Sequence, residues 1–208
     1  MRKPILYDLD LRVCDLIEPQ TKTWDRVNKN ITSEHGGRGG RINQVLSWQR
    51  PPSDTLKCNV GIAWSKGKSM AGSGWIVRDD KGEVVLHSRR AFSGIDSLIE
   101  AKHTGLLWAL ESLGSHRIER VCVEVEAPEL VGVVERPGAW PSYRAYGREL
   151  QVVLGRHNAW KLKAVSRGAN RTAFLIARSV TMDMRLQSYV ARGEPDWLRV
   201  IVDEEKRW

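Results

Sequence analysis

The stretch GSGWIVRDDKGEVVLHSRRAF at residues 72–92 decides the fold of this chain. It holds two runs of β-branched and apolar residues on either side of Asp79, Asp80, Lys81 and Gly82, and a glycine in such a turn readily adopts a positive φ. Just before it, LKCNVGIAW at 56–64 carries apolar residues at alternate positions, which is the period of a strand. The three runs together predict a three-stranded antiparallel meander.

After the meander the apolar residues recur with a helical period. SLIEAKHTGLLWALESLG at 97–114 predicts a helix, with Ser97 and Glu100 as a capping box and Gly114 at its end. Five further elements follow: a strand at RVCVEVE (120–126), a helical turn at 128–135, a helix at 142–156, a strand at 160–166 and a helix at 169–184. This order predicts an α/β fold, a five-stranded mixed sheet flanked by helices.

Composition limits the class of protein. The chain carries 33 Lys and Arg against 25 Asp and Glu, a net charge of +8 and a pI near 9.6, which permits contact with phosphates but also suits a solvated surface. Cys14, Cys58 and Cys122 are widely separated, which argues against disulfides and a zinc site. No apolar run reaches the ~20 residues of a membrane span, and acids come too early for a targeting peptide. We therefore expect a reducing compartment, the cytoplasm or the nucleus.

The chain divides into three expected segments. Residues 1–47 lack a steady period and include GGRGGR at 36–41, so they are predicted to form a flexible arm, in which a single such repeat is more typical of a linker than of an RNA-binding motif. Residues 48–182 contain the predicted strands and helices and form the domain. Residues 183–208 are predicted to be a charged C-terminal tail.

Several motifs resemble the plant ribonuclease-H-like domain at the end of non-LTR retroelement polyproteins. WQRPP at 48–52 before LKCNV resembles that family's entry into its first strand, and GSGWIVRDDKGEVV resembles its second strand and hairpin. VEVEAPELV at 123–131 and VSRGANRTAFLIAR at 165–178 resemble its fourth-strand and last-helix signatures. VCDLIEPQTKTWD at 13–25 resembles the segment before its zinc-knuckle-like region, which is missing. The resemblance implies a ribonuclease-H-like fold and a retroelement fragment with an internal deletion.

The resemblance also implies a site for two Mg²⁺ ions held by four carboxylates. Carried over by position, these acids fall on Gly61, Glu100, Glu126 and Phe174. Glycine and phenylalanine supply no carboxylate, and glutamate adds a methylene where aspartate is usual. We therefore expect a catalytically inactive remnant with no metal and no cofactor, and Mg²⁺ only if activity remains. The alternatives are one weak Mg²⁺ at Glu100 and Glu126, and a Glu100 that only caps its helix.

Basic residues around the lost site favour binding of RNA, DNA or an RNA-DNA hybrid, with no membrane partner. If they share one face, the candidate phosphate contacts are Lys66, Lys68, Arg89, Arg90, Lys161, Lys163, Arg167, Arg171 and Arg178. Two other functions stay open: an active Mg²⁺-dependent hybrid ribonuclease that uses replacement ligands, and a protein-interaction scaffold.

Overall fold

The structure is a computed structural model that describes residues 47–207. The predicted arm therefore lies outside the described residues, except for Ser47. No helix in the described range is long and apolar enough to cross a membrane.

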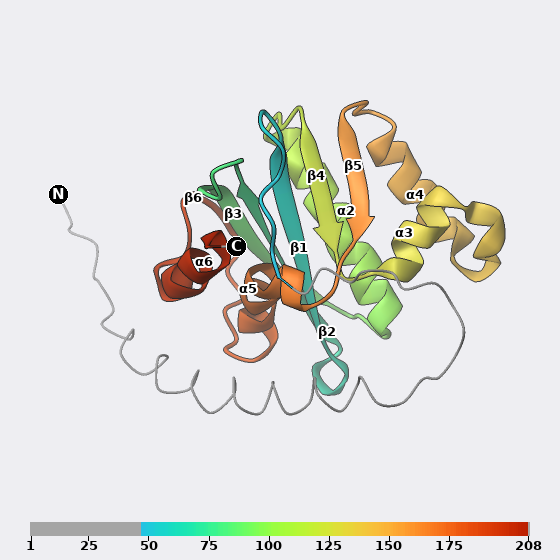
Figure 1. The fold of residues 1–208 in the computed structure, drawn as a ribbon. Helices are drawn as coiled ribbons and strands as arrows, with labels where there is room; N and C mark the ends of the chain where they lie inside the picture. The colour runs from blue at the N-terminus through green and yellow to red at the C-terminus, as the bar shows by residue number, and fades with distance from the viewer. Residues whose placement is uncertain (1–46, 208) are drawn as a thin grey trace, which may run out of the picture. The chain divides into compact units, whose positions relative to one another are not determined.

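A six-stranded mixed sheet forms the centre of the domain (Figure 1). The predicted meander is present as β1 (Leu56–Ser65), β2 (Met70–Arg78) and β3 (Val84–Ser93), and the short helix η3 (Lys66–Lys68) joins the first two strands. β4 (Val121–Val125) runs parallel to β1, and β5 (Trp160–Ala164) runs parallel to β4. The strand order is β5-β4-β1-β2-β3-β6. The α/β fold is thus confirmed, and the five expected strands are joined by a sixth, β6 (Tyr189–Arg192).

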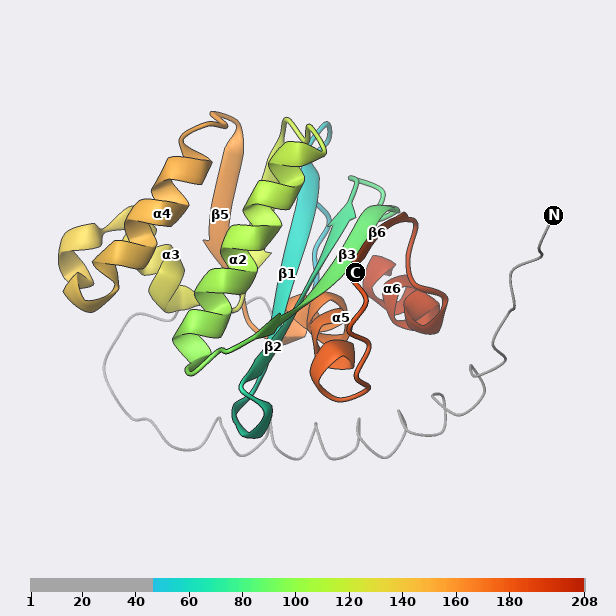
Figure 2. The ribbon, with the colours of Figure 1, turned by 180° about the vertical axis from the view of Figure 1, so that it is seen from behind.

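Helices cover both faces of this sheet (Figures 1 and 2). On one face lie α2 (Leu98–Ser115), α3 (Pro128–Glu135) and α4 (Arg144–Leu154), with η4 (Pro137–Ala139) and η5 (Pro141–Tyr143) between the last two. The main core fills this side, where Val60, Trp75 and Val123 of the sheet pack with Leu110 and Leu150 of the helices. On the other face lie η6 (Gly168–Asn170), α5 (Arg171–Thr181), η7 (Asp196–Leu198) and α6 (Arg199–Lys206).

The prediction of a charged tail over 183–208 is wrong for the described residues, which end at 207. β6 pairs antiparallel with β3, and Leu198 and Val202 are fully buried in a second core with Ile76 and Ile176. The segment was misread because α6, RVIVDEEK, is short and mostly charged, and two adjacent apolar residues, Ile201 and Val202, are enough to bury one side of it. The folded domain therefore extends through α6.

Replacing Leu198 with alanine tests this assignment. Truncating a fully buried leucine leaves a cavity, so Leu198→Ala should lower the free energy of unfolding by about 2–5 kcal/mol. Val200 is 72% exposed in the same segment, and Val200→Ala should change that free energy by less than about 0.5 kcal/mol. Urea unfolding measures both changes. Equally small changes would mean that the segment does not pack on the sheet.

Candidate functional site

Helix α5 lies directly against β1 and β2, where three glycines occupy the strands. A β-carbon at Gly61 would lie 2.1 Å from the carbonyl oxygen of Ala173, and one at Gly72 would lie 2.2 Å from that of Ala177. At Gly74 it would lie 2.4 Å from the side chain of Ile176. Such distances are too short for any side chain. The position where the resemblance places the first acid is therefore covered by the backbone of α5.

Asn170, from the last-helix motif, helps to set this close approach. Its side-chain amide donates a hydrogen bond of 2.8 Å to the carbonyl oxygen of Val60 in β1, and the residue is 2% exposed. The same side chain stands at the N-cap of α5 but makes no capping hydrogen bond. Asn170 therefore ties the start of α5 to β1 and leaves the helix end uncapped by a side chain.

At the end of β4, Arg167 connects two of the family's acid positions. Its Nε forms an ion pair and hydrogen bond with the carboxylate of Glu126, and its guanidinium lies 3.7 Å from the centroid of the Phe174 ring. Both contacts favour a cation at this point. The guanidinium thus supplies the positive charge that the Glu126 carboxylate would otherwise take from a bound cation.

Glu100 has a local structural role in the first turn of α2. Its backbone N–H donates to Ser97 Oγ at 3.2 Å, and its carboxylate accepts from the backbone N–H of Asp96 at 3.0 Å. The predicted Ser97 cap is therefore confirmed. Within residues 47–207, no three His, Cys, Asp or Glu side chains gather as a metal site would require. With Gly61 covered and Glu126 paired to Arg167, the residues present do not fit a two-ion centre.

The structure separates the basic residues that the sequence groups together. Lys66 and Lys68 lie at the β1–β2 turn, where Lys68 donates to the carbonyl oxygen of Thr181 at 2.8 Å. Two of the others stack on aromatic rings, Arg89 on Tyr189 and Arg90 on Phe92. Two form ion pairs, Arg167 with Glu126 and Arg171 with Glu204. Arg178 lies in the last turn of α5. Arg89 and Arg90 are consecutive residues of β3 and point to opposite faces of the sheet, so the whole set does not share one face.

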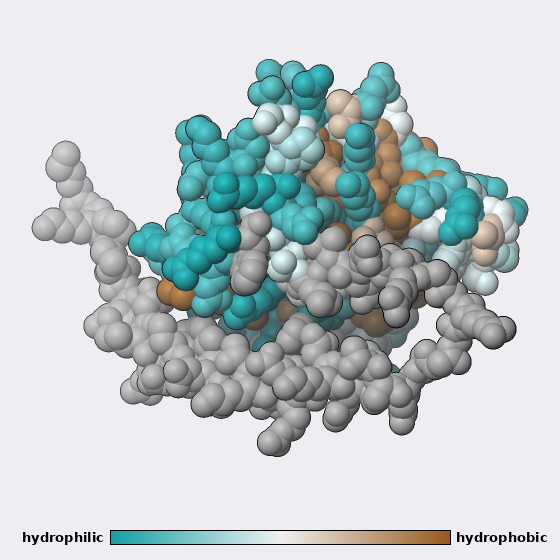
Figure 3. All heavy atoms as spheres, viewed as in Figure 1, coloured by the Kyte–Doolittle hydropathy of each residue, from teal (hydrophilic) through white to brown (hydrophobic). Residues whose placement is uncertain are grey.

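Lys161 and Lys163 instead line a cleft of about 620 Å³ over β4 and β5. This part of the sheet is left open by α5, which lies over β1 and β2, and by α6, which lies farther from β4 and β5 (Figure 1). Register places Cys122 beside Lys161 and Glu124 beside Lys163. In Figure 3, hydrophobic residues lie between projecting hydrophilic side chains over these two strands.

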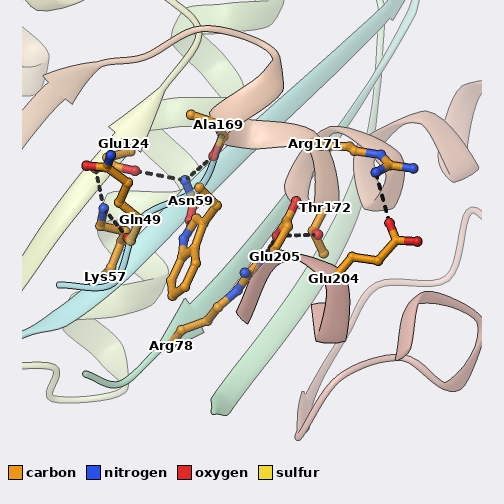
Figure 4. Close-up of polar contacts among 11 residues, drawn as sticks. Gln49, Lys57, Asn59, Arg78, Glu124, Ala169, Arg171, Thr172, Glu204 and Glu205 are labelled. Carbon is orange, nitrogen blue, oxygen red and sulfur yellow. Dashed lines mark hydrogen bonds and ion pairs between the residues drawn. The ribbon is translucent and has the colours of Figure 1, made fainter. Parts of the chain in front are cut away.

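The acidic residue among the described lining residues, Glu124, is already neutralised (Figure 4). Its carboxylate lies 2.8 Å from Lys57 Nζ and accepts a hydrogen bond of 3.1 Å from the Asn59 side chain. Trp48 Nε1 donates to Asn59 Oδ1 at 2.8 Å and so holds the entry segment on β1. Burial, followed by the charge of Glu124, raises the pKa of the Cys122 thiol, which stays protonated. The remaining cleft charge is therefore positive.

The same buried network continues to the C-terminal helix (Figure 4). Arg78 lies over the Trp48 ring at 4.4 Å and pairs with Glu205 of α6 at 2.6 Å. The Glu205 carboxylate also accepts a hydrogen bond of 2.8 Å from Thr172 Oγ1 of α5. Burial lowers the pKa of the Arg78 guanidinium, and Glu205 opposes this effect. The network joins β2, α5, α6 and the entry segment.

Sequence reasoning missed three basic residues of the cleft lining, Arg50, Lys57 and Arg120. Lys57 had a detectable signal, because it alternates with Asn59 and Gly61 and so lies on the same face of β1. Arg50 and Arg120 had no such signal in the sequence. Arg50 lies in the segment before β1 and Arg120 directly before β4, and only the pairing of β1, β4 and β5 brings these two segments close to β5.

Solved structures with this arrangement belong to the ribonuclease H class. RNase H1 from the archaeon Halobacterium salinarum is 18% identical, with a TM-score of 0.55 over 62% of this chain and 98% of that one. An N-terminal RNase H domain from Mycobacterium tuberculosis is 19% identical, with a TM-score of 0.53 over 62% and 94%. LC11-RNase H1, solved in complex with an RNA/DNA hybrid, is 15% identical, with a TM-score of 0.51 over 60% and 95%. The chain therefore has a ribonuclease-H-like fold.

A family model assigns the chain more closely. The model described as Reverse transcriptase-like matches residues 58–180, and this chain belongs to that family. No curated protein matches the sequence.

Adding one methyl group at Gly61 tests whether α5 seals this position. Gly61→Ala should lower the free energy of unfolding by about 3 kcal/mol, because the new β-carbon meets the backbone of Ala173. Gly67 has nothing within 4 Å of the corresponding position, so Gly67→Ala should change the free energy by less than about 1 kcal/mol. Chemical unfolding of both variants measures the difference. A fully stable Gly61→Ala protein would show that α5 can withdraw from β1.

Proposed function

We propose that this chain is a nucleic-acid-binding ribonuclease-H-like domain that does not cleave its ligand, an inactive remnant of a retroelement ribonuclease H. One observation carries the proposal: the first acid position of the family holds a sealed glycine, Gly61, and the carboxylate retained at another, Glu126, is paired with Arg167. A cation of the protein itself thus stands where the reaction needs carboxylates free to bind metal.

Loss of cleavage follows from the chemistry of hybrid hydrolysis. Two neighbouring divalent ions activate the water and stabilise the leaving oxygen, and hard cations of this kind need several anionic oxygens. Phe174 offers an aromatic face that is stacked on a guanidinium, and Glu100 accepts a hydrogen bond at its helix terminus. These side chains support packing and capping and supply no shared ligand set.

Binding is supported by the family of the chain, by the ligand of one structural neighbour and by the charge of the chain and of its cleft. The chain belongs to the Reverse transcriptase-like family, and LC11-RNase H1, which shares its fold, was solved with an RNA/DNA hybrid. The net charge of the chain is +8, and the cleft acid Glu124 is paired. Positive potential of this kind attracts phosphate backbones whatever their sequence.

Cys58 and Cys122 are buried free thiols, in keeping with our proposal that the protein works in the cytoplasm or the nucleus.

A metal titration tests the loss of the ion site. The thermal midpoint and the tryptophan fluorescence should be unchanged by Mg²⁺ or Mn²⁺, because a ligand raises the midpoint only when it binds the folded state. Sodium chloride at matched ionic strength is the control. A rise in midpoint with Mn²⁺ that Glu126→Gln abolishes would contradict the proposal and favour a single-ion site at Glu126.

Binding and cleavage are separated by two assays on the same labelled RNA-DNA hybrid. Fluorescence anisotropy in EDTA should show binding that weakens linearly with the logarithm of salt concentration. Incubation with Mg²⁺ or Mn²⁺ should leave the hybrid intact while an active ribonuclease H degrades it. Cleavage lost in Glu126→Gln would identify an active enzyme. Absence of binding even at low salt would favour a protein-interaction scaffold.

A further inference from the structure

The cleft over β4 and β5 gathers basic side chains that have no partner among residues 47–207. Arg120, Lys161 and Lys163 are exposed, and none of their side chains makes an ion pair or hydrogen bond with another described residue. By contrast, Lys57, Lys102 and Arg167 lie in ion pairs. The cleft therefore contains three exposed basic side chains whose charge no described acid neutralises.

Strand geometry arranges these groups in rows. Lys57, Cys122 and Lys161 are register neighbours across β1, β4 and β5, and Glu124 and Lys163 form part of the next row. Lys161 and Lys163 are two residues apart on one face of β5, about 6.7 Å along the strand. This separation is close to the distance between successive phosphates of one nucleic-acid strand. The charges of Lys57, Lys161 and Lys163 all act on the Cys122 thiol, in keeping with a shared face.

The width of the cleft floor distinguishes one strand from two. From β1 to β5 there are two interstrand steps, roughly 10 Å in all. Such a floor accommodates one sugar-phosphate strand but not the full width of a duplex. The described residues of the lining include no aromatic residue on which bases would stack, so contacts to phosphates dominate and little sequence preference is expected.

We infer that this cleft binds one strand of nucleic acid through its phosphates, with Arg120, Lys161 and Lys163 as the contacts. The inference rests on the proposed function and gives it a location, on the open part of the sheet and apart from the sealed position at Gly61. Because Lys57 neutralises Glu124, no acid in the described lining opposes the bound phosphates.

Charge reversal in the cleft tests this location with a fluorescein-labelled thymidine oligonucleotide. Lys161→Glu together with Lys163→Glu should weaken binding at least about tenfold and lower the slope of log affinity against log salt by about two. The matched control is Arg144→Glu with Arg148→Glu, which makes the same change in net charge at two exposed positions of α4, on the face of the sheet that α2 covers. The control should bind within about threefold of wild type. Thermal midpoints of both variants establish that they are folded.

The outcomes separate the two proposals. If wild type binds the oligonucleotide and the two double variants lose equal affinity, binding follows overall charge and the cleft is not the site. If the cleft variant binds as wild type does, its lysines only discourage pairing at an exposed edge strand, and the inference fails while the proposed function stands. If wild type binds no nucleic acid, both fail. An unlabelled duplex that competes better than the single strand would also overturn the assignment.

Discussion

The closeness of α5 to β1 and β2 is the constraint on which the rest of this structure depends. A helix backbone reaches a sheet this closely only where the strands lack side chains, and Gly61, Gly72 and Gly74 supply that gap. Asn170 holds the start of the helix by its bond to Val60, and Ile176 then packs against Ile76 in the second core. With α5 in this place, α6 can cover β2 and β3, while β4 and β5 stay open.

The same constraint changes the electrostatics of the site. A glycine at the centre of β1 leaves no acid beneath α5, and the retained carboxylate at Glu126 is balanced by Arg167. Further into the sheet, Glu124 is balanced by Lys57, and Glu205 by Arg78. Buried charges are stable only when paired in this manner, since an unpaired one costs several kcal/mol. The described acids on this face are thereby used in structure.

Fold and chemistry are thus separable in this domain. The Reverse transcriptase-like family match and the ribonuclease H neighbours describe the scaffold, whose meander and parallel strands are intact. Scaffolds of this kind carry function through particular side chains, and among the described residues that line the cleft over β4 and β5 the unpaired charged side chains are basic.

Local patterns in the sequence determined the meander, the helix capped by Ser97 and the five expected strands. Residue identity alone determined that Gly61 and Phe174 carry no carboxylate. Alternation and helical period can be read from the sequence because they depend only on residues that are close together along the chain. They did not determine the sixth strand and α6. Leu198, Ile201 and Val202 are too few to form an apolar pattern in a segment that is mostly charged. They become buried only because Ile76 of β2 and Ile176 of α5 pack against them in the second core. Nor did the local patterns show which basic residues share a face. Only the tertiary structure decided that Arg167 pairs with Glu126. It also decided that the side chains of Arg120, Lys161 and Lys163 lie together without an ion pair to a described residue. The reason is that strand register and the position of α5 fix the distances between residues that are far apart in the sequence.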